Sequence, residues 1–358
     1  MRLRVSFVLP LVTLFASHAV TQASSGPGST GPGTAEAAND PSSRIEGQLD
    51  GPSWTVNLPL PEPRGAAQGS TVASYDGSLI YHIGGGCCFS SLDGMDRVWA
   101  YSPTDDSWSA RANFPLSSGI RSYGSAVELN GYIYVFGGVT GGPSSQELLL
   151  NTTWIYDEAN DGWFQGANMP GFRFGSAVAT DGAVIWVISG YQGVSFGDAT
   201  NTVWMYDPST DAYSTGFAET PWYLGRIHGV ELADGTVHVF AGLYPQDAHL
   251  VYDTAMDAWS FAPSMPFRVL DPAVVTDGTI IYLGGGNGDV PRPPGHTQIY
   301  DPATSAWSEG PPMPAPAVNN TSGTIANGTF YVIGGYDGSR SVSVNYSLSL
   351  FELKPSGR

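Results

Sequence analysis

The chain carries very little positive charge. Of its 358 residues one is lysine (Lys354) and thirteen are arginine, against 32 acidic residues, so the formal net charge is −18. A surface of this sign repels phosphate backbones, and the sequence therefore disfavours nucleic acid as a partner. The plainest use of the excess acids is solubility, which we favour over a dedicated acidic function.

Motifs for metal, nucleotide and hydrolytic chemistry are also missing. The sequence has no HExxH, no Cys/His cluster with metal-ligand spacing, no P-loop and no GxSxG elbow. We therefore expect neither a metal nor an organic cofactor. His82 and His238 lie inside aliphatic strands and are expected to be packed core residues, whereas His249 and His296 are expected in loops.

Long apolar runs are confined to the start of the chain. Residues 1–23 are typical of a signal peptide, with Arg2 and Arg4 before the apolar run Val5–Ala16 and small residues near Ala23. The run is too short to span a bilayer, and no later segment is apolar enough to do so. We therefore expect a secreted protein or one in the lumen of the secretory pathway.

Low-complexity sequence flanks the rest of the chain. Residues 24–50 are rich in Gly, Pro, Ser, Thr and Ala without periodicity, which predicts a disordered linker. Residues 354–358 form a short tail. Secretion would also make Asn-x-Ser/Thr sequons meaningful. They occur at Asn151, Asn319, Asn320, Asn327 and Asn345, of which Asn151, in a polar loop, is the best glycosylation candidate.

Cysteine is scarce, and its two copies are adjacent. Cys87 and Cys88 follow the glycines of the stretch Gly84–Phe89. In an oxidising compartment we favour a disulfide between these two neighbours, which would stiffen the loop. A redox-active pair is the alternative, although neither a Cys-x-x-Cys spacing nor a third cysteine supports it.

Glycine, proline and aromatic residues are abundant, and they recur with a period of about fifty residues. Each unit has an alternating strand, a turn pair, an aliphatic strand ending at glycine, and a strand ending in tyrosine. The turn pairs are Asp76-Gly77, Asn130-Gly131, Asp181-Gly182, Asp234-Gly235, Asp277-Gly278 and Asn327-Gly328. Such pairs predict two-residue hairpins of the primed type, with positive φ at both residues.

Two further marks recur in each unit. The glycine marks are Gly84-Gly85, Gly137-Gly138, Ser189-Gly190, Ala241-Gly242, Gly284-Gly285 and Gly334-Gly335. The tyrosines Tyr101, Tyr156, Tyr206, Tyr252 and Tyr300 each precede an aromatic residue by seven positions, namely Trp108, Trp163, Tyr213, Trp259 and Trp307. Over residues 51–353 this pattern resembles the kelch repeat. The resemblance implies an all-β fold, a six-bladed β-propeller with one four-stranded blade per repeat.

The sixth unit lacks its last strand, because the chain ends shortly after Leu353. Ser53-Trp54 with Pro61 matches the outer-strand pattern at the other end of the domain. We therefore predict that the N-terminal strand completes the last blade, with Trp54 as the clasp. Closing the ring removes free sheet edges, so a monomer is expected.

In kelch propellers the loops after the glycines and the links into each inner strand share one mouth of the channel, and this places the candidate site. The catalytic candidates are Arg121, Arg173, Arg226, His228 and Tyr336. The substrate-binding candidates are Cys87, Cys88, Phe89, Tyr123, Phe174, Tyr191, Trp222, Tyr223, Tyr244, Asp271, Asn287 and Asn320. Arginine among aromatics suits a small molecule with an anionic or carbonyl oxygen. Alternatively, these arginines, and Arg268 near Asp271, pair with neighbouring carbonyls or acids.

Three functions compete. The chain is similar in overall type to secreted fungal kelch propellers that act as hetero-Diels–Alderases in tropolone–sesquiterpene pathways, and this cofactor-independent reaction is the preferred hypothesis. Bacterial sialic-acid mutarotases are also secreted six-bladed kelch proteins, and an anomerase could use Asp271 or Asp337 as its carboxylate. The third is a non-catalytic module that binds a glycan or a protein.

Overall fold

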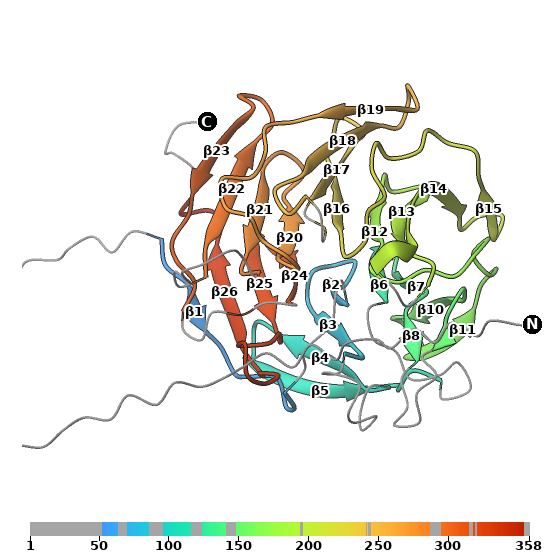
Figure 1. Cartoon of the computed structure of the whole chain (residues 1–358). Coiled ribbons are helices and arrows are strands. Elements are labelled where there is room, and N and C mark those ends of the chain that lie inside the picture. The colour runs from blue at the N-terminus through green and yellow to red at the C-terminus, as the bar shows by residue number, and fades with distance from the viewer. Residues whose placement is uncertain are drawn as a thin grey trace, which may run out of the picture. The chain divides into compact units, whose positions relative to one another are not determined.

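Six four-stranded antiparallel sheets follow one another along the chain as the blades of a propeller (Figure 1). The computed structural model describes residues 52–63, 70–85, 96–115, 124–140, 148–193, 196–240, 242, 245–286, 295–314, 318 and 321–353. Within these ranges no helix has the length and apolar character needed to cross a membrane.

Each of the first three blades is a run of strands from the channel outwards. Blade 1 has β2 (Thr71–Ala73), β3 (Ile80–Ile83), β4 (Val98–Ser102) and β5 (Ser107–Arg111). Blade 2 has β6 (Ser125–Leu129), β7 (Tyr132–Phe136), β10 (Thr153–Asp157) and β11 (Gly162–Gln165). Blade 3 has β12 (Ala177–Thr180), β13 (Ile185–Tyr191), β14 (Ala199–Asp207) and β15 (Ala212–Ser214). The short pair β8 (Val139–Thr140) and β9 (Leu148–Leu149) is an insertion in blade 2, and the 3-10 helix η2 (Phe196–Asp198) is one in blade 3.

The last three blades have the same strand order, except that the outer strand of blade 6 comes from the N-terminal end of the domain. Blade 4 has β16 (His228–Glu231), β17 (Thr236–Phe240), β18 (His249–Asp253) and β19 (Ala258–Phe261). Blade 5 has β20 (Ala273–Thr276), β21 (Ile281–Gly284), β22 (Thr297–Asp301) and β23 (Ala306–Glu309). Blade 6 has β24 (Ser322–Ala326), β25 (Thr329–Ile333), β26 (Asn345–Ser349) and, as its outer strand, β1 (Thr55–Val56).

The core lies between neighbouring blades. The second strand of every blade is apolar almost throughout, and it is buried on both faces because a blade covers each side. Ile83 of blade 1, for example, packs in one cluster with Ile133 and Tyr156 of blade 2. Burying each such side chain contributes roughly 1.5–3 kcal/mol, so blade-to-blade packing holds the ring together.

The repeated tyrosine and tryptophan also bind adjacent blades to each other. Tyr156 donates its hydroxyl proton to Asp161 (2.6 Å), and the same carboxylate oxygen accepts the backbone N–H of Ala112 from blade 1 (2.7 Å). The indole of Trp163 donates to the carbonyl of Ala112 (2.9 Å). These three hydrogen bonds recur where Tyr252, Asp257 and Trp259 meet Ala218. The seven-residue spacing in the sequence therefore marks a clasp between blades.

Ring closure by the N-terminal strand is confirmed. β1 pairs antiparallel with β26, and the two lie side by side in Figure 1. Leu58 plays for blade 1 the part that Ala112 plays for blade 2, because it binds both Asp106 (2.8 Å) and Trp108 (3.0 Å). Trp54 is buried and donates to the carbonyl of Pro311 (3.1 Å), which makes it the outer-strand tryptophan of blade 6.

The turn prediction is right for two of the six pairs and wrong for the other four. Asn130-Gly131 and Asn327-Gly328 have positive φ at both residues and form two-residue hairpins. At the Asp-Gly pairs the aspartate does not share the positive φ of its glycine. Its carboxylate instead accepts a backbone N–H two residues later, as Asp181 does from Ala183 (2.8 Å). The carboxylate thus stabilises an Asx turn in place of the left-handed backbone that asparagine tolerates.

The glycine marks define one end of the channel. In blade 5 the mark is Gly285-Gly286 and not Gly284-Gly285, because Gly284 still pairs with Ala273 and positive φ begins at Gly285. Inner strands start, and second strands end, at this end of every blade. We call this end the glycine face and the opposite end, where the Asp-Gly and Asn-Gly turns lie, the turn face.

Candidate functional site

Many predicted site residues lie outside the described ranges. These are Cys87, Cys88, Phe89, Arg121, Tyr123, Tyr244, Asn287 and Asn320. The described candidates come from blades 3 to 6, and they separate into groups with different surroundings. Three of them, Arg226, His228 and Asp271, lie together at the seam between blades 4 and 5.

The link into β16 is fixed by contacts with blade 3. The carbonyl of Leu224 accepts the N–H of Gly190 (2.8 Å), and the N–H of Ile227 donates to the carbonyl of Gly175 (3.2 Å). Between them, Gly225 lies so close to the ring of Tyr191 that a Cβ there would come within 2.2 Å of it. These contacts hold the backbone rigidly on either side of Arg226.

Arg226 and Asp271 form an ion pair across the seam. Two guanidinium nitrogens face the two carboxylate oxygens, with Nε to Oδ1 at 3.2 Å and Nη2 against Oδ2. Asp271 is 1% exposed, and the Arg226 side chain is 18% exposed. Such a bidentate pair fixes the plane of the guanidinium. The arginine near Asp271 in sequence, Arg268, pairs instead with Asp247 (3.5 Å).

Both residues of the pair adopt positive φ, at 58° for Arg226 and 53° for Asp271. Each lies two residues before the first residue of its inner strand, and Gly175 takes the same conformation at that place in blade 3. A non-glycine residue in this region costs about 1 kcal/mol. The repeat therefore imposes the backbone shape, and blades 4 and 5 keep charged side chains there despite the cost.

His228 begins β16, two residues after Arg226. Burial, together with the positive charge of Arg226, lowers the pKa of its imidazole to about 4. The ring is therefore neutral at pH 7. Within the described residues its Nε2 is shielded from solvent and has no hydrogen-bond partner. Arg226, His228 and Asp271 thus place a cation, a neutral imidazole and a carboxylate at one point of the glycine face.

Arg173 lies beneath the glycine face and not on it. The side chain is buried, its guanidinium carbon lies 3.9 Å from the ring centre of Trp204, and it donates to the hydroxyl of Thr202 (2.5 Å). Burial lowers its pKa to about 10, so it remains charged at neutral pH. Its surroundings are those of a residue that holds blade 3 together.

The predicted aromatic candidates divide into buried and exposed ones. Phe174 and Tyr191 stack with ring centres 4.9 Å apart, and Tyr191 is buried, so this pair supports the link to Arg226. Trp222 and Tyr223 are exposed, and Trp222 packs against Phe261 at 5.1 Å. These exposed rings lie on the same link as Arg226.

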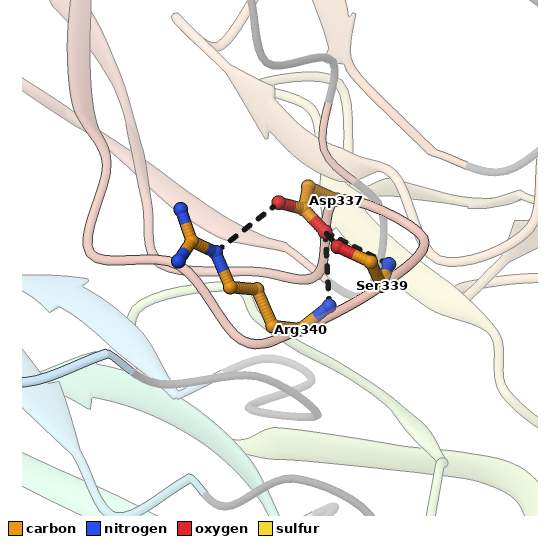
Figure 2. A network of polar contacts seen from close by, with 3 residues as sticks. All are labelled: Asp337, Ser339 and Arg340. Atoms are coloured by element: carbon orange, nitrogen blue, oxygen red, sulfur yellow. Dashed lines mark hydrogen bonds and ion pairs between the residues drawn. The ribbon is translucent and has the colours of Figure 1, made fainter.

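The loop of blade 6 is held by its own acid. Asp337 accepts hydrogen bonds from the N–H groups of Ser339 (2.8 Å) and Arg340 (2.9 Å) and from the Ser339 hydroxyl (2.6 Å) (Figure 2). The hydrogen bond from the Ser339 hydroxyl is the main reason that the pKa of Asp337 falls to about 2. Tyr336 is half-buried at the base of this loop, where it pairs with Ser341. Asp337 therefore serves to shape its loop.

Two cavities lie along the channel axis. The one nearer the glycine face, which we call the throat, has about 80 Å³ and is lined among others by Thr71, Ser125, Ser176, His228 and Ser322. The other, the turn-side cavity, has about 380 Å³ and is lined among others by Thr71, Glu128, Thr180, Glu231 and Thr324. Among the described residues no group of three or more His, Cys, Asp and Glu could hold a metal ion.

The sequons differ in their surroundings. Asn345 is buried, and its amide nitrogen donates to the carbonyl of Leu58 (3.1 Å), so it is not open to modification in the closed ring. The amide of Asn327 is exposed but donates to the carbonyl of Gly77 (3.0 Å). Asn151 is half-buried beside β10, and glycosylation there stays a prediction.

Some polar residues of the channel were not predicted from the sequence. Ser322 and Thr71 share a hydrogen bond (2.5 Å), and Thr71 bonds the Nδ1 of His82 (2.9 Å). His82 and His238 are buried as predicted, but His249, expected in a loop, begins β18 and is buried as well. The first residues of the inner strands carried the missing signal, because Ser125, His228 and Ser322 hold that position and line the axis.

Comparison with protein families identifies the repeat. The model of the kelch motif matches residues 120–170, 173–216 and 271–314. Mouse Kelch-like protein 35 is 29% identical over 160 residues, which cover 44% of this chain and 24% of that protein. Kelch-like protein terF of Aspergillus terreus is 24% identical over 255 residues, covering 65% of this chain and 52% of terF. The chain spans about half the length, or less, of these relatives.

A solved structure has the same architecture. The structure of YjhT superimposes with a TM-score of 0.65 at 16% identity, covering 81% of this chain and 96% of that one. At this identity the likeness concerns the fold alone. Together with the matched repeats it identifies a six-bladed propeller of kelch repeats, with distant homology to kelch-like proteins, one of them fungal.

Proposed function

We propose that this six-bladed kelch-repeat propeller is a secreted, cofactor-independent enzyme that takes a small molecule with an anionic or carbonyl oxygen at its glycine face. The observation that carries the proposal is the convergence of Arg226, His228 and Asp271 at the seam of blades 4 and 5. Strain and burial are concentrated there, as is common at functional sites.

The ion pair would orient the substrate. Because Asp271 fixes the plane of the Arg226 guanidinium, the pair would hold this cation in one orientation toward a substrate oxygen. Preorganised donors of this kind stabilise charge that develops in a transition state. A bound anion would also offset the repulsion between Arg226 and an imidazolium, and so raise the pKa of His228 from about 4.

The preferred reaction is a hetero-Diels–Alder cyclisation in fungal secondary metabolism. A guanidinium that binds the carbonyl oxygen of an electron-poor diene makes that diene more electrophilic, and a pericyclic step transfers no proton. The exposed rings of Trp222 and Tyr223 would receive an apolar partner. The similarity to a fungal kelch-like protein and the signal-peptide pattern at the N-terminus support this choice.

A second candidate, a sugar mutarotase, is favoured by one observation. Anomer exchange needs a base and an acid beside the ring oxygen, and here a carboxylate and an imidazole flank one arginine. The two reactions differ in their need for proton transfer. Replacing His228 should therefore slow mutarotation strongly and leave a pericyclic rate almost unchanged.

The test compares Arg226→Gln with Arg340→Gln, which changes an exposed arginine that faces Asp337 in the loop of blade 6. Each variant is incubated with a quinone methide plus an apolar terpene, to measure the enantiomeric excess of the adduct. Each is also incubated with a sialic acid, to follow anomer exchange by NMR. We expect Arg226→Gln to lose about 100-fold in rate and Arg340→Gln to stay within about twofold.

Equal rates for wild type and Arg226→Gln would overturn the assignment of the site. Saturable binding that depends on Arg226, without rate enhancement for either substrate class, would instead indicate the third candidate, a glycan- or protein-binding module. An effect of His228→Gln on the measured rate then separates mutarotation from cyclisation.

A further inference from the structure

The throat and the turn-side cavity adjoin each other along the channel axis. Six wall residues belong to both: Thr71, Ala126, Val178, Gly229, Val274 and Gly323. A water molecule needs about 10–15 Å³ of such space, so both the throat, with about 80 Å³, and the turn-side cavity, with about 380 Å³, can hold several. The axis therefore offers a passage from the glycine face to the turn face, and where the two cavities adjoin it is lined by the Thr71 hydroxyl among small and apolar residues.

Hydroxyl oxygens line the throat with their protons already engaged. Ser125 donates to the carbonyl of Ser176 (2.6 Å), and Ser176 donates to the carbonyl of Ser189 (2.8 Å). Across the channel, Ser322 and Thr71 bond each other. Lone pairs of these hydroxyls remain to accept hydrogen bonds, as water requires. All four side chains are at least nine-tenths buried, so the throat is built into the fold.

One strand carries a proton-binding group at each end of this passage. β16 begins with His228, on the throat, and ends with Glu231, on the turn-side cavity. Within the described residues, His228 Nε2 and Glu231 Oε2 are both shielded from bulk solvent and have no hydrogen-bond partner. Along a strand these two residues are about 10 Å apart, a gap that two or three water molecules bridge.

We propose that the axial channel is a water-filled proton path between Glu231 and His228, so that His228 exchanges protons with solvent through the turn face. In the forward direction the Glu231 carboxyl gives its proton to a water molecule. Each water passes one of its own protons on, and the last gives one to His228 Nε2. Solvent at the turn face then protonates the Glu231 carboxylate again. The use of such a path rests on the proposed function, in which His228 needs a proton while substrate covers Arg226. The path can be tested in the free protein, because Nε2 of His228 is already shielded from solvent there.

The charges around both ends favour a protonated Glu231 and a neutral His228, so His228 takes up the proton only transiently. His228 faces the cation of Arg226, which is paired with Asp271, so an imidazolium there is short-lived. Glu231 faces Asp181 and Asp234, and burial together with these carboxylates raises its pKa to about 7. It therefore holds and releases a proton near neutral pH.

The experiment measures exchange of the His228 ring proton with solvent by NMR on the free full-length protein labelled with ¹⁵N-histidine. We expect Glu231→Gln to slow exchange by about tenfold, since an amide cannot relay a titrating proton. The matched control is Glu128→Gln. Glu128 lines the same turn-side cavity at the same place in β6, but its carboxylate accepts the N–H of Gly131 (2.7 Å), and we expect a change of less than about twofold.

A second variant, Val274→Met, extends a side chain into the wall shared by the two cavities, and it should also slow exchange. Exchange as fast as in the wild type in both Glu231→Gln and Val274→Met would overturn the proposal. Equal slowing in Glu231→Gln and Glu128→Gln would overturn it too. Because no substrate is present, a failure here is distinct from a failure of the Arg226 test.

Discussion

Two imidazoles between blades 4 and 5 illustrate how burial controls a titratable residue. His249 donates from Nδ1 to the carbonyl of Pro263 (3.2 Å), so in the neutral ring its Nε2 accepts from Nδ1 of His238 (2.8 Å). The rings of Phe240, Tyr300 and Trp307 surround the pair. Burial lowers the pKa of His238 to about 4 and that of His249 to about 3.

This pair should make the fold sensitive to acid. Both pKa values lie below that of an unfolded histidine, near 6.5, so protonation favours the unfolded state. The stabilisation is complete above pH 6.5 and is lost as the pH falls towards 4. Between pH 7 and pH 5 the loss is roughly 2 kcal/mol for each histidine, or about 4 kcal/mol for the pair, measured as the free energy of urea unfolding.

The informative comparison is with His249→Phe, which keeps an aromatic ring among its neighbours. Glu158 and Glu231, whose pKa values burial raises to about 7, titrate in the same window with the opposite sign. Both glutamates are present in wild type and variant, so their contributions to the pH dependence of stability cancel when the two proteins are compared. The gap in stability between wild type and variant should therefore narrow as the pH falls, and a constant gap would contradict the prediction.

At the scale of the element, the turns between inner and second strands differ by one chemical group. Asn130 lies in the left-handed region (φ 56°), whereas Asp181 keeps negative φ and accepts the N–H groups of Ala183 and Val184, both at 2.8 Å. The same position in the repeat is thus stabilised by two mechanisms. The two turns also differ in length, because two residues separate β6 from β7 and four separate β12 from β13.

Glycine substitution should separate these mechanisms. Asn130→Gly relieves the left-handed strain and should change the free energy of unfolding by less than about 0.5 kcal/mol. Asp181→Gly removes the carboxylate oxygen that accepts two backbone N–H groups, at a position that needs no positive φ, and it should destabilise by about 1–2 kcal/mol. Urea titration measures both changes, as shifts of the unfolding midpoint with an unchanged dependence of the free energy on urea concentration. An equal loss of stability in the two variants would refute the assignment of two turn types.

At the scale of the whole molecule, the ring depends on one N-terminal strand. β1 covers the edge of β26, Trp54 packs against Phe330 of blade 6, and Leu58 binds the outer strand of blade 1. Because Trp54 also donates to the carbonyl of Pro311 in blade 5, contacts at both ends of this short segment join the last blade to the fifth and to the first.

Removal of residues 1–65 should open the ring. The edge of β26 would then be free to pair with another chain, so we expect association in size-exclusion chromatography and a much lower thermal midpoint. Removal of residues 1–48, which leaves β1 and Trp54 in place, is the matched control and should leave a monomer. A stable monomer after the longer truncation would show that β1 is dispensable.

The sequence by itself determined the repeat, the six blades and the closing strand, because these depend on local periods and on residues such as Tyr156 and Trp163 that every blade reuses. Tertiary structure decided which polar residues meet. Arg226 and Asp271 are 45 positions apart and belong to different repeats, and only the curvature of the ring brings them together. It also placed Arg173 in the interior and aligned His228 and Glu231 along the axis. The Arg226–Asp271 contact arises between blades, where no pattern within one repeat can specify it.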